Sequence, residues 1–187
     1  MALLNAAIVI AASTSVTPST VYIIRHGEKI GSNGCLSKTG EARAASLPAV
    51  FDGQPSPSHP TFSVPFALFA HAYDSSIDCE RCRQTLTPIS NWLHLPINSR
   101  FGSKAKLGGN EAAAVAIVNT TGVERVVLVA WEHENIRSLT SHLGVDKSLI
   151  PYWNGDDYDT VFELQMKGGA VVNFTVTKQG FQGSVLQ

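Results

Sequence analysis

The chain has 187 residues, of which 44% are apolar, so it is long enough to bury a sizeable hydrophobic core as one domain. Its formal net charge of −1 excludes a chain-wide basic surface of the kind that holds nucleic acid, and no polybasic run indicates an anionic membrane as partner. Any positive potential must therefore be local, at a site built from a few side chains.

The first nineteen residues differ from the rest of the chain. Ala2 to Ala12 is an apolar run followed by small residues, as in the core of a secretory signal. No Lys or Arg precedes the run, and it is too short to span a bilayer. We therefore expect residues 1–19 to be a retained apolar extension and residues 20–187 to form a single domain. This interpretation favours a cytoplasmic location, with secretion as the alternative.

Strand-like and helix-like segments alternate along the remaining chain. Apolar and β-branched runs predict strands, and the Lys-Gly-Gly turn at 167–169 predicts that the last two pair as an antiparallel hairpin. In chain order, the expected strands are residues 21–24, 66–70, 125–130, 161–165 and 170–176.

Helices are expected from capping residues and from apolar periodicity. In chain order, they run from a Ser37 cap to near Pro48, from an Asp78 cap to about Leu93, from an Asn110 cap to Asn119, and over residues 136–143. Such alternation predicts an α/β fold, a three-layer α/β/α sandwich with a mainly parallel central sheet and an antiparallel edge hairpin.

In sheets of this kind, ligands bind at the carboxyl ends of the strands. The first strand ends in Arg25 and His26, the second leads to the helix start that carries Arg81, and the third runs into His133. We therefore expect two arginines and two histidines at one edge of the sheet. Arginine binds two phosphoryl oxygens at once, and a neutral imidazole nitrogen is a competent nucleophile toward phosphorus.

Four segments resemble, in order, the motifs of the histidine phosphatase superfamily, also called the phosphoglycerate mutase-like family. Residues 25–28, with sequence Arg-His-Gly-Glu, resemble its signature, and residues 36–40 with Ala42 and Ala44 resemble the start of its first helix. Arg81 followed by Gln84-Thr85 resembles the second arginine motif. The strand 126–130 running into His133 resembles the second-histidine motif.

The resemblance implies a phosphoglycerate mutase-like fold and a phosphatase that hydrolyses phosphomonoesters through a covalent phosphohistidine on His26. Arg25, Arg81 and His133 would hold the transferring group. The implied mechanism needs no metal ion and no cofactor. A small phosphorylated molecule would be the partner, and the sequence does not fix an oligomeric state.

The general acid that protonates the leaving group is the least determined residue. One branch of the family places a Glu after the second arginine motif, but no Asp or Glu lies between Arg81 and Asn110. The other branch places an Asp directly after the second histidine, where this chain has Glu134. Glu134 is therefore the first candidate and Glu111 the second. Glu132 and Glu28 are further possible acids, although a structural role is favoured for both.

Other readings stay open. A mutase of the same family would return the phosphoryl group to a rearranged substrate, and a non-catalytic module would keep the phosphate pocket for binding. His71, near the second strand end, could also line the pocket, although a surface or packing role is favoured for it. Trp131, Trp153 and Tyr158 are candidates for the pocket wall.

Three cysteines are present, and an odd number argues against a pure disulfide framework. Cys79 and Cys82 have C-x-x-C spacing, but no second Cys/His pair completes a zinc site. We interpret Cys35, Cys79 and Cys82 as packing or incidental residues rather than as redox or metal ligands.

Overall fold

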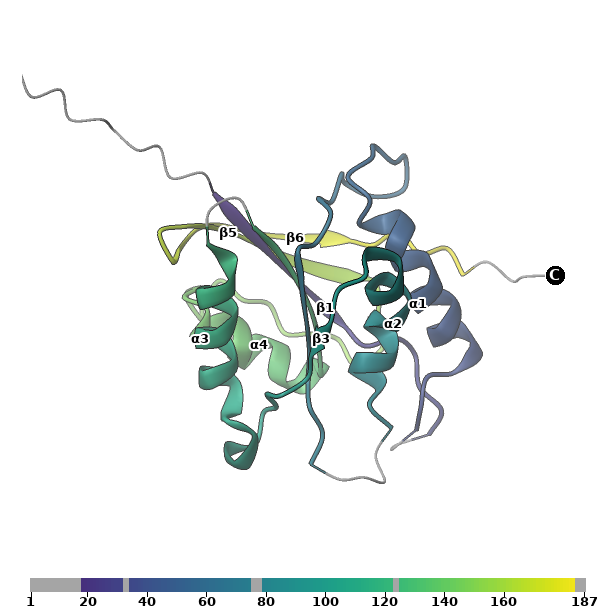
Figure 1. The fold of residues 1–187 in the computed structure, drawn as a ribbon, viewed down its shortest axis with the longest axis horizontal. Helices are drawn as coiled ribbons and strands as arrows, with labels where there is room; N and C mark the ends of the chain where they lie inside the picture. The colour runs from purple at the N-terminus through teal and green to yellow at the C-terminus, as the bar shows by residue number, and fades with distance from the viewer. Residues whose placement is uncertain (1–17, 32–33, 75–78, 123–124, 184–187) are drawn as a thin grey trace, which may run out of the picture.

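A computed structural model describes residues 18–31, 34–74, 79–122 and 125–183 (Figure 1). Residues 1–17 of the apolar extension and Asp78, the expected cap, lie outside these ranges. The elements run in the order β1 (Ser19–Arg25), α1 (Lys38–Val50), β2 (Ala67–Ala70), α2 (Arg81–Leu93), β3 (Ile97–Asn98), the 3-10 turn η1 (Ala105–Leu107), α3 (Gly109–Thr121), β4 (Val126–Trp131), α4 (His133–His142), β5 (Thr160–Lys167) and β6 (Ala170–Lys178).

Six strands form one sheet in the order β3-β2-β4-β1-β5-β6. The first four are parallel, whereas β5 is antiparallel to both β1 and β6. Helices α1 and α2 lie on one side of the sheet, and α3 and α4 lie on the other (Figure 1). The predicted α/β/α sandwich with its antiparallel edge hairpin is confirmed.

The alternation of side chains along β1 divides the core into two layers. Val21 and Ile23 pack in the cluster that includes Ile117 of α3. Tyr22 and Ile24 point to the other face and pack in the cluster that includes Leu47 of α1. Because both faces of β1 are buried, the strand is apolar from Val21 to Ile24 and ends abruptly in Arg25.

Helix starts follow the predictions only in part. Ser37 caps α1 as expected, since its side chain accepts a hydrogen bond from the backbone N–H of Gly40. Asn110 does not cap α3, because that helix already begins at Gly109. Its side-chain oxygen instead accepts a hydrogen bond from Nε1 of buried Trp131 at 3.1 Å. A buried indole N–H needs such a partner, which explains the polar residue at this position.

Other boundaries also differ from the expectation. Helix α2 begins at Arg81 with Glu80 as its N-cap residue, and α1 continues past Pro48 to Val50. The two-residue strand β3 has no counterpart among the predicted strands, because it is too short to give an alternating pattern. No helix among the described residues is long and apolar enough to cross a membrane.

The cysteine interpretation is wrong for two of the three residues. Cys35 and Cys79 form a disulfide across 44 positions of sequence, with their Cα atoms 4.8 Å apart. Cys82 is the free, buried cysteine, and its sulfur lies 3.2 Å from the Tyr73 hydroxyl. The disulfide ties the segment before α1 to the segment before α2. It therefore closes beside the start of the helix that carries Arg81.

Candidate active site

The end of β1 fixes His26 in one tautomer. His26 is fully buried, and its Nδ1 lies 2.7 Å from the carbonyl oxygen of Gly27. A carbonyl only accepts, so Nδ1 carries the proton and Nε2 keeps its lone pair. Gly27 is required here because a Cβ atom at that position would lie 2.9 Å from the carbonyl oxygen of Gly40. Its N–H donates to the Thr85 hydroxyl at 2.8 Å, which ties the turn to α2.

Arg81, the first residue of α2, faces the free nitrogen of His26. Its Nε donates to Nε2 of His26 at 3.1 Å, and its Nη2 donates to Oε1 of Glu132 at 2.7 Å. Its guanidinium also lies over the Tyr73 ring, 4.6 Å from the centroid. Anchored on both sides, the Arg81 guanidinium presents a charge-assisted donor to whatever occupies the space in front of His26.

The buried surroundings keep His26 neutral. Burial is the largest cause, and it lowers the pKa of His26 from 6.5 to about 3. The Gly27 carbonyl opposes this shift, whereas the cationic Arg81 and Arg25 add to it. A neutral imidazole with its lone pair on Nε2 is the state that a nucleophile requires.

Arg25 is held by a segment from the far end of the chain. Its Nη1 donates to the carbonyl oxygens of Gly155 and Asp157, and its Nη2 donates to the Tyr158 hydroxyl at 3.1 Å. Only 2% of Arg25 is exposed, and its Nε is buried without a hydrogen-bond partner among the described residues. The loop before β5 therefore satisfies most, but not all, of this guanidinium.

The end of β4 supplies the remaining predicted residues. Glu132 is the N-cap residue of α4, and His133 and Glu134 form the first turn. Nδ1 of His133 is buried and has no hydrogen-bond partner within the described part of the chain. Burial and then the positive charge of Arg25 lower the pKa of His133, while Glu134 opposes the shift. This histidine is therefore also biased toward its neutral form.

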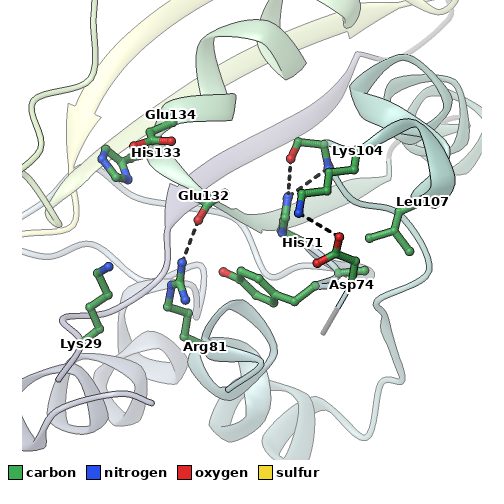
Figure 2. Close-up of a pocket in the computed structure, with 12 residues that line it drawn as sticks. Lys29, His71, Asp74, Arg81, Lys104, Leu107, Glu132, His133 and Glu134 are labelled. Carbon is green, nitrogen blue, oxygen red and sulfur yellow. Dashed lines mark hydrogen bonds and ion pairs between the residues drawn. The ribbon is translucent and has the colours of Figure 1, made fainter. Parts of the chain in front are cut away.

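A cavity of about 280 Å³ opens at this edge of the sheet (Figure 2). Arg81, His133 and Glu134 line it, whereas Arg25 and His26 are buried away from its wall. Glu132 also lines it and is ion-paired with Arg81. Glu111, the second candidate acid, is exposed on α3 and is not part of the cavity lining.

Sequence reasoning missed several residues of this cavity. His71, for which the sequence favours a surface or packing role over the alternative of lining the pocket, does line the cavity, and its Nε2 accepts a hydrogen bond from the N–H of Ser103 at 3.0 Å. Lys104 and Asp74 form an ion pair at 2.8 Å on the same side (Figure 2). Lys104 and Asp74 come from loops rather than strand ends, so periodicity gives no signal for them.

Glu28 and two of the aromatic candidates, Trp131 and Tyr158, lie in different surroundings. Glu28 forms an ion pair with Arg43 of α1 at 2.8 Å. Trp131 is a core residue, while Tyr158 stacks against Arg25 at 3.7 Å from the guanidinium carbon. The described residues contain no group of three or more His, Cys, Asp or Glu side chains that could hold a metal ion.

No protein-family model matches the sequence, and no curated protein matches it. Solved structures do resemble the fold. The protein histidine phosphatase SixA in complex with tungstate has a TM-score of 0.57 at 16% identity, covering 86% of this chain and 97% of that one. A mycobacterial glucosyl-3-phosphoglycerate phosphatase has a TM-score of 0.56 at 12% identity, covering 85% and 97%.

A phosphoglycerate mutase from Plasmodium falciparum also resembles the fold, with a TM-score of 0.50 at 13% identity, covering 86% of this chain and 89% of that one. These similar structures are members of the histidine phosphatase superfamily. The chain therefore has the fold of the histidine phosphatase superfamily, as its four sequence motifs predicted.

Proposed function

We propose that this protein is a phosphatase of the histidine phosphatase superfamily that hydrolyses small phosphomonoesters through a phosphohistidine on His26. The observation that carries the proposal is the hydrogen bonding of the His26 ring. Nδ1 donates to the Gly27 carbonyl, and Nε2, the reactive nitrogen, faces Arg81. A phosphoryl group that takes the place of the Arg81 contact would meet a neutral nucleophile in a single tautomer.

In the first step, the Nε2 lone pair of His26 forms a bond to phosphorus while the bond from phosphorus to the ester oxygen breaks. The departing oxygen takes a proton from the general acid. In the second step, water gives up a proton to that same group, now a carboxylate, and its oxygen attacks phosphorus. The N–P bond breaks, its electron pair returns to Nε2, and inorganic phosphate leaves.

Arg25, Arg81 and His133 would hold the phosphoryl oxygens. Two polar atoms among these three residues, Nε of Arg25 and Nδ1 of His133, are buried without a partner in the described part of the chain, and a bound anion would satisfy both. The negative charge of that anion would also oppose the lowered pKa of His133, so the imidazole would take up a proton as the group binds.

Glu134 remains the proposed general acid. It lines the cavity beside His133, whereas the Glu132 carboxylate is already engaged by Arg81 at 2.7 Å. A carboxylate in an ion pair is a poor proton donor because the neighbouring cation favours its charged form. Glu132 is instead proposed to position Arg81.

The test is hydrolysis of a generic aryl phosphate without added metal by the wild type, His26→Ala and the control His94→Ala, which changes an exposed histidine at the end of α2. We expect the wild type and His94→Ala to release phosphate at equal rates and His26→Ala to release none. An acid-labile phosphoryl label should be trapped on the wild type and on His94→Ala, but not on His26→Ala. Turnover that survives in His26→Ala would rule out the mechanism, and a mutase would form the label yet release little inorganic phosphate.

A further inference from the structure

A second, larger cavity adjoins the candidate active site. It has a volume of about 660 Å³ and shares His133 and Glu134 with the first cavity. Ligand sites for small molecules commonly have volumes of about 300–1,000 Å³. Any group bonded to a phosphorus atom held beside His133 therefore has this cavity as its nearest large space.

One wall of the second cavity is a polar face of α4. Glu134, Ser138 and Ser141 recur at spacings of four and three residues, so their side chains lie on one face of the helix. Glu134 is also the proposed general acid. A leaving group that receives its proton from Glu134 would thus lie along the two serine hydroxyls.

The lining contributed by the segment after α4 includes two aromatic side chains that are held in place. Tyr152 is 85% exposed, and its ring lies against the Arg137 guanidinium, 4.5 Å from the ring centroid. Arg137 is itself fixed by donation to the carbonyl oxygens of Lys147 and Ile150 at 2.9 and 3.1 Å. An exposed aromatic ring with a fixed partner offers a preorganised stacking surface.

Trp153 is anchored in a similar way. Its Nε1 donates to the carbonyl oxygen of Asp157 at 2.8 Å, and its ring packs against Phe162 at 4.8 Å between centroids. Gly155 also lines the second cavity, and its carbonyl oxygen accepts a hydrogen bond from Arg25. The wall of the second cavity and the ligation of Arg25 are therefore parts of one segment.

We propose that this cavity binds the leaving group of the substrate and that the substrate is a phosphomonoester of a hydroxylated ring, such as a sugar phosphate. The proposal rests on the phosphatase function proposed above. Aromatic faces pack against the C–H face of a sugar ring, while serine hydroxyls, Glu134 and Lys147 bind its hydroxyl groups. A short acyclic phosphate would leave both walls uncovered.

The test compares a hexose 6-phosphate with glycerol 3-phosphate as substrates. Tyr152→Ala and Ser138→Ala remove one contact from each wall, Tyr152→Phe keeps the ring, and Trp92→Ala changes an exposed aromatic residue on α2 that lines neither cavity. We expect Tyr152→Ala to lower kcat/KM about tenfold for the hexose phosphate, through KM, and to leave glycerol phosphate unchanged. Tyr152→Phe and Trp92→Ala should resemble the wild type. Ser138→Ala should lower kcat/KM for the hexose phosphate and leave kcat/KM for glycerol phosphate unchanged.

Binding supplies a readout that does not depend on catalysis. In the His26→Ala background, calorimetry should show tighter binding of the hexose phosphate than of glycerol phosphate, and Tyr152→Ala should abolish the difference. Equal affinities, or equal losses for both ligands, would overturn the leaving-group site. A wild type that turns over no phosphoester but keeps this binding preference would contradict the phosphatase function alone.

Discussion

Nε of Arg81 donates to Nε2 of His26 across 3.1 Å, so the proposed nucleophilic atom has a cationic partner in the unliganded protein. Glu132 holds the other arm of the same guanidinium at 2.7 Å. Arg81 thus has one fixed contact and one that an incoming phosphoryl oxygen can replace. This arrangement makes the planar shape of the side chain matter as much as its charge.

Replacement of Arg81 by Lys should therefore be costly although the charge is kept. An ammonium group cannot contact Glu132 and a phosphoryl oxygen in the same fixed geometry, so we expect kcat/KM on an aryl phosphate to fall by about 10²-fold or more. Arg83→Lys is the matched control, because Arg83 is exposed and its ion pair among the described residues is with Glu80, the N-cap residue of α2. Similar losses in the two variants would contradict the assigned role of Arg81.

Glu132→Gln tests the positioning role of the carboxylate. The amide keeps the shape but loses the charge, so Arg81 should be held less firmly while the proposed acid Glu134 is untouched. We expect a moderate fall in kcat with an unchanged pH profile, whereas Glu134→Gln should remove the basic limb of the profile for substrates with poor leaving groups. If Glu132→Gln alone removed that limb, Glu132 rather than Glu134 would be the acid.

Stability should fall in mild acid because two histidines are buried in neutral form. Burial lowers the pKa of His26 to about 3 and that of His71 to about 4, from 6.5 in both cases. Below pH 6.5 the unfolded chain therefore binds protons that the folded chain does not. The free energy of unfolding should decrease as the pH falls from about 6.5 toward about 4.

Urea unfolding at several values between pH 7 and pH 4.5 measures this slope. His71→Asn removes one of the two groups, so its free energy of unfolding should depend less steeply on pH than that of the wild type. His94→Asn, at an exposed position, should keep the wild-type slope. An equal slope in all three proteins would show that buried His71 does not contribute to the acid dependence of stability.

The sequence predicted the residues at the strand ends because parallel strands bring their carboxyl ends to one edge. Arg25 and His26 from β1, and His133 after β4, meet for that reason. Their proximity to Arg81 is observed, while the catalytic and binding roles of these residues stay predictions. The two-layer core also follows from sequence, since a strand buried on both faces reads as a continuous apolar run.

Features that depend on long loops were not predictable. The disulfide joins Cys35 to Cys79, and spacing alone cannot fix which cysteines pair. The contact that holds the His71 ring comes from Ser103, which lies far along the chain. Arg25 is likewise bound by the segment around Gly155, which lies near β1 because the following strand, β5, pairs with β1.

The hydrogen bonds that hold Arg25 predict an effect of Tyr158 on anion binding. The Tyr158 hydroxyl accepts a hydrogen bond from Arg25, and its ring lies 3.7 Å from the guanidinium carbon. Tyr158→Phe removes the hydrogen bond but keeps the ring, so Arg25 should be released to a bound anion more easily. We expect vanadate to bind Tyr158→Phe a few-fold more tightly than the wild type, as measured by calorimetry. Weaker binding would indicate that the hydroxyl contacts the anion directly.

Reduction of the Cys35–Cys79 disulfide should destabilise the protein. The bond closes a loop with a sequence separation of 44, and restricting such a loop in the unfolded chain is worth about 4 kcal/mol in the chain-entropy estimate. We expect dithiothreitol to lower the Tm of the wild type. The double variant Cys35→Ser/Cys79→Ser should have the lower Tm with or without reductant, since its one remaining cysteine, Cys82, is free and buried.

The same bond should also affect the site. Cys79 lies two residues before Arg81, and its carbonyl oxygen accepts a hydrogen bond from the Arg81 backbone N–H at 2.7 Å. Loss of the disulfide frees this segment, so the helix start that aims Arg81 at His26 loses a tether. We expect KM for an aryl phosphate to rise on reduction at temperatures well below the Tm, and not to rise in the double variant. A KM that changes equally in both proteins would mean that the reductant acts elsewhere.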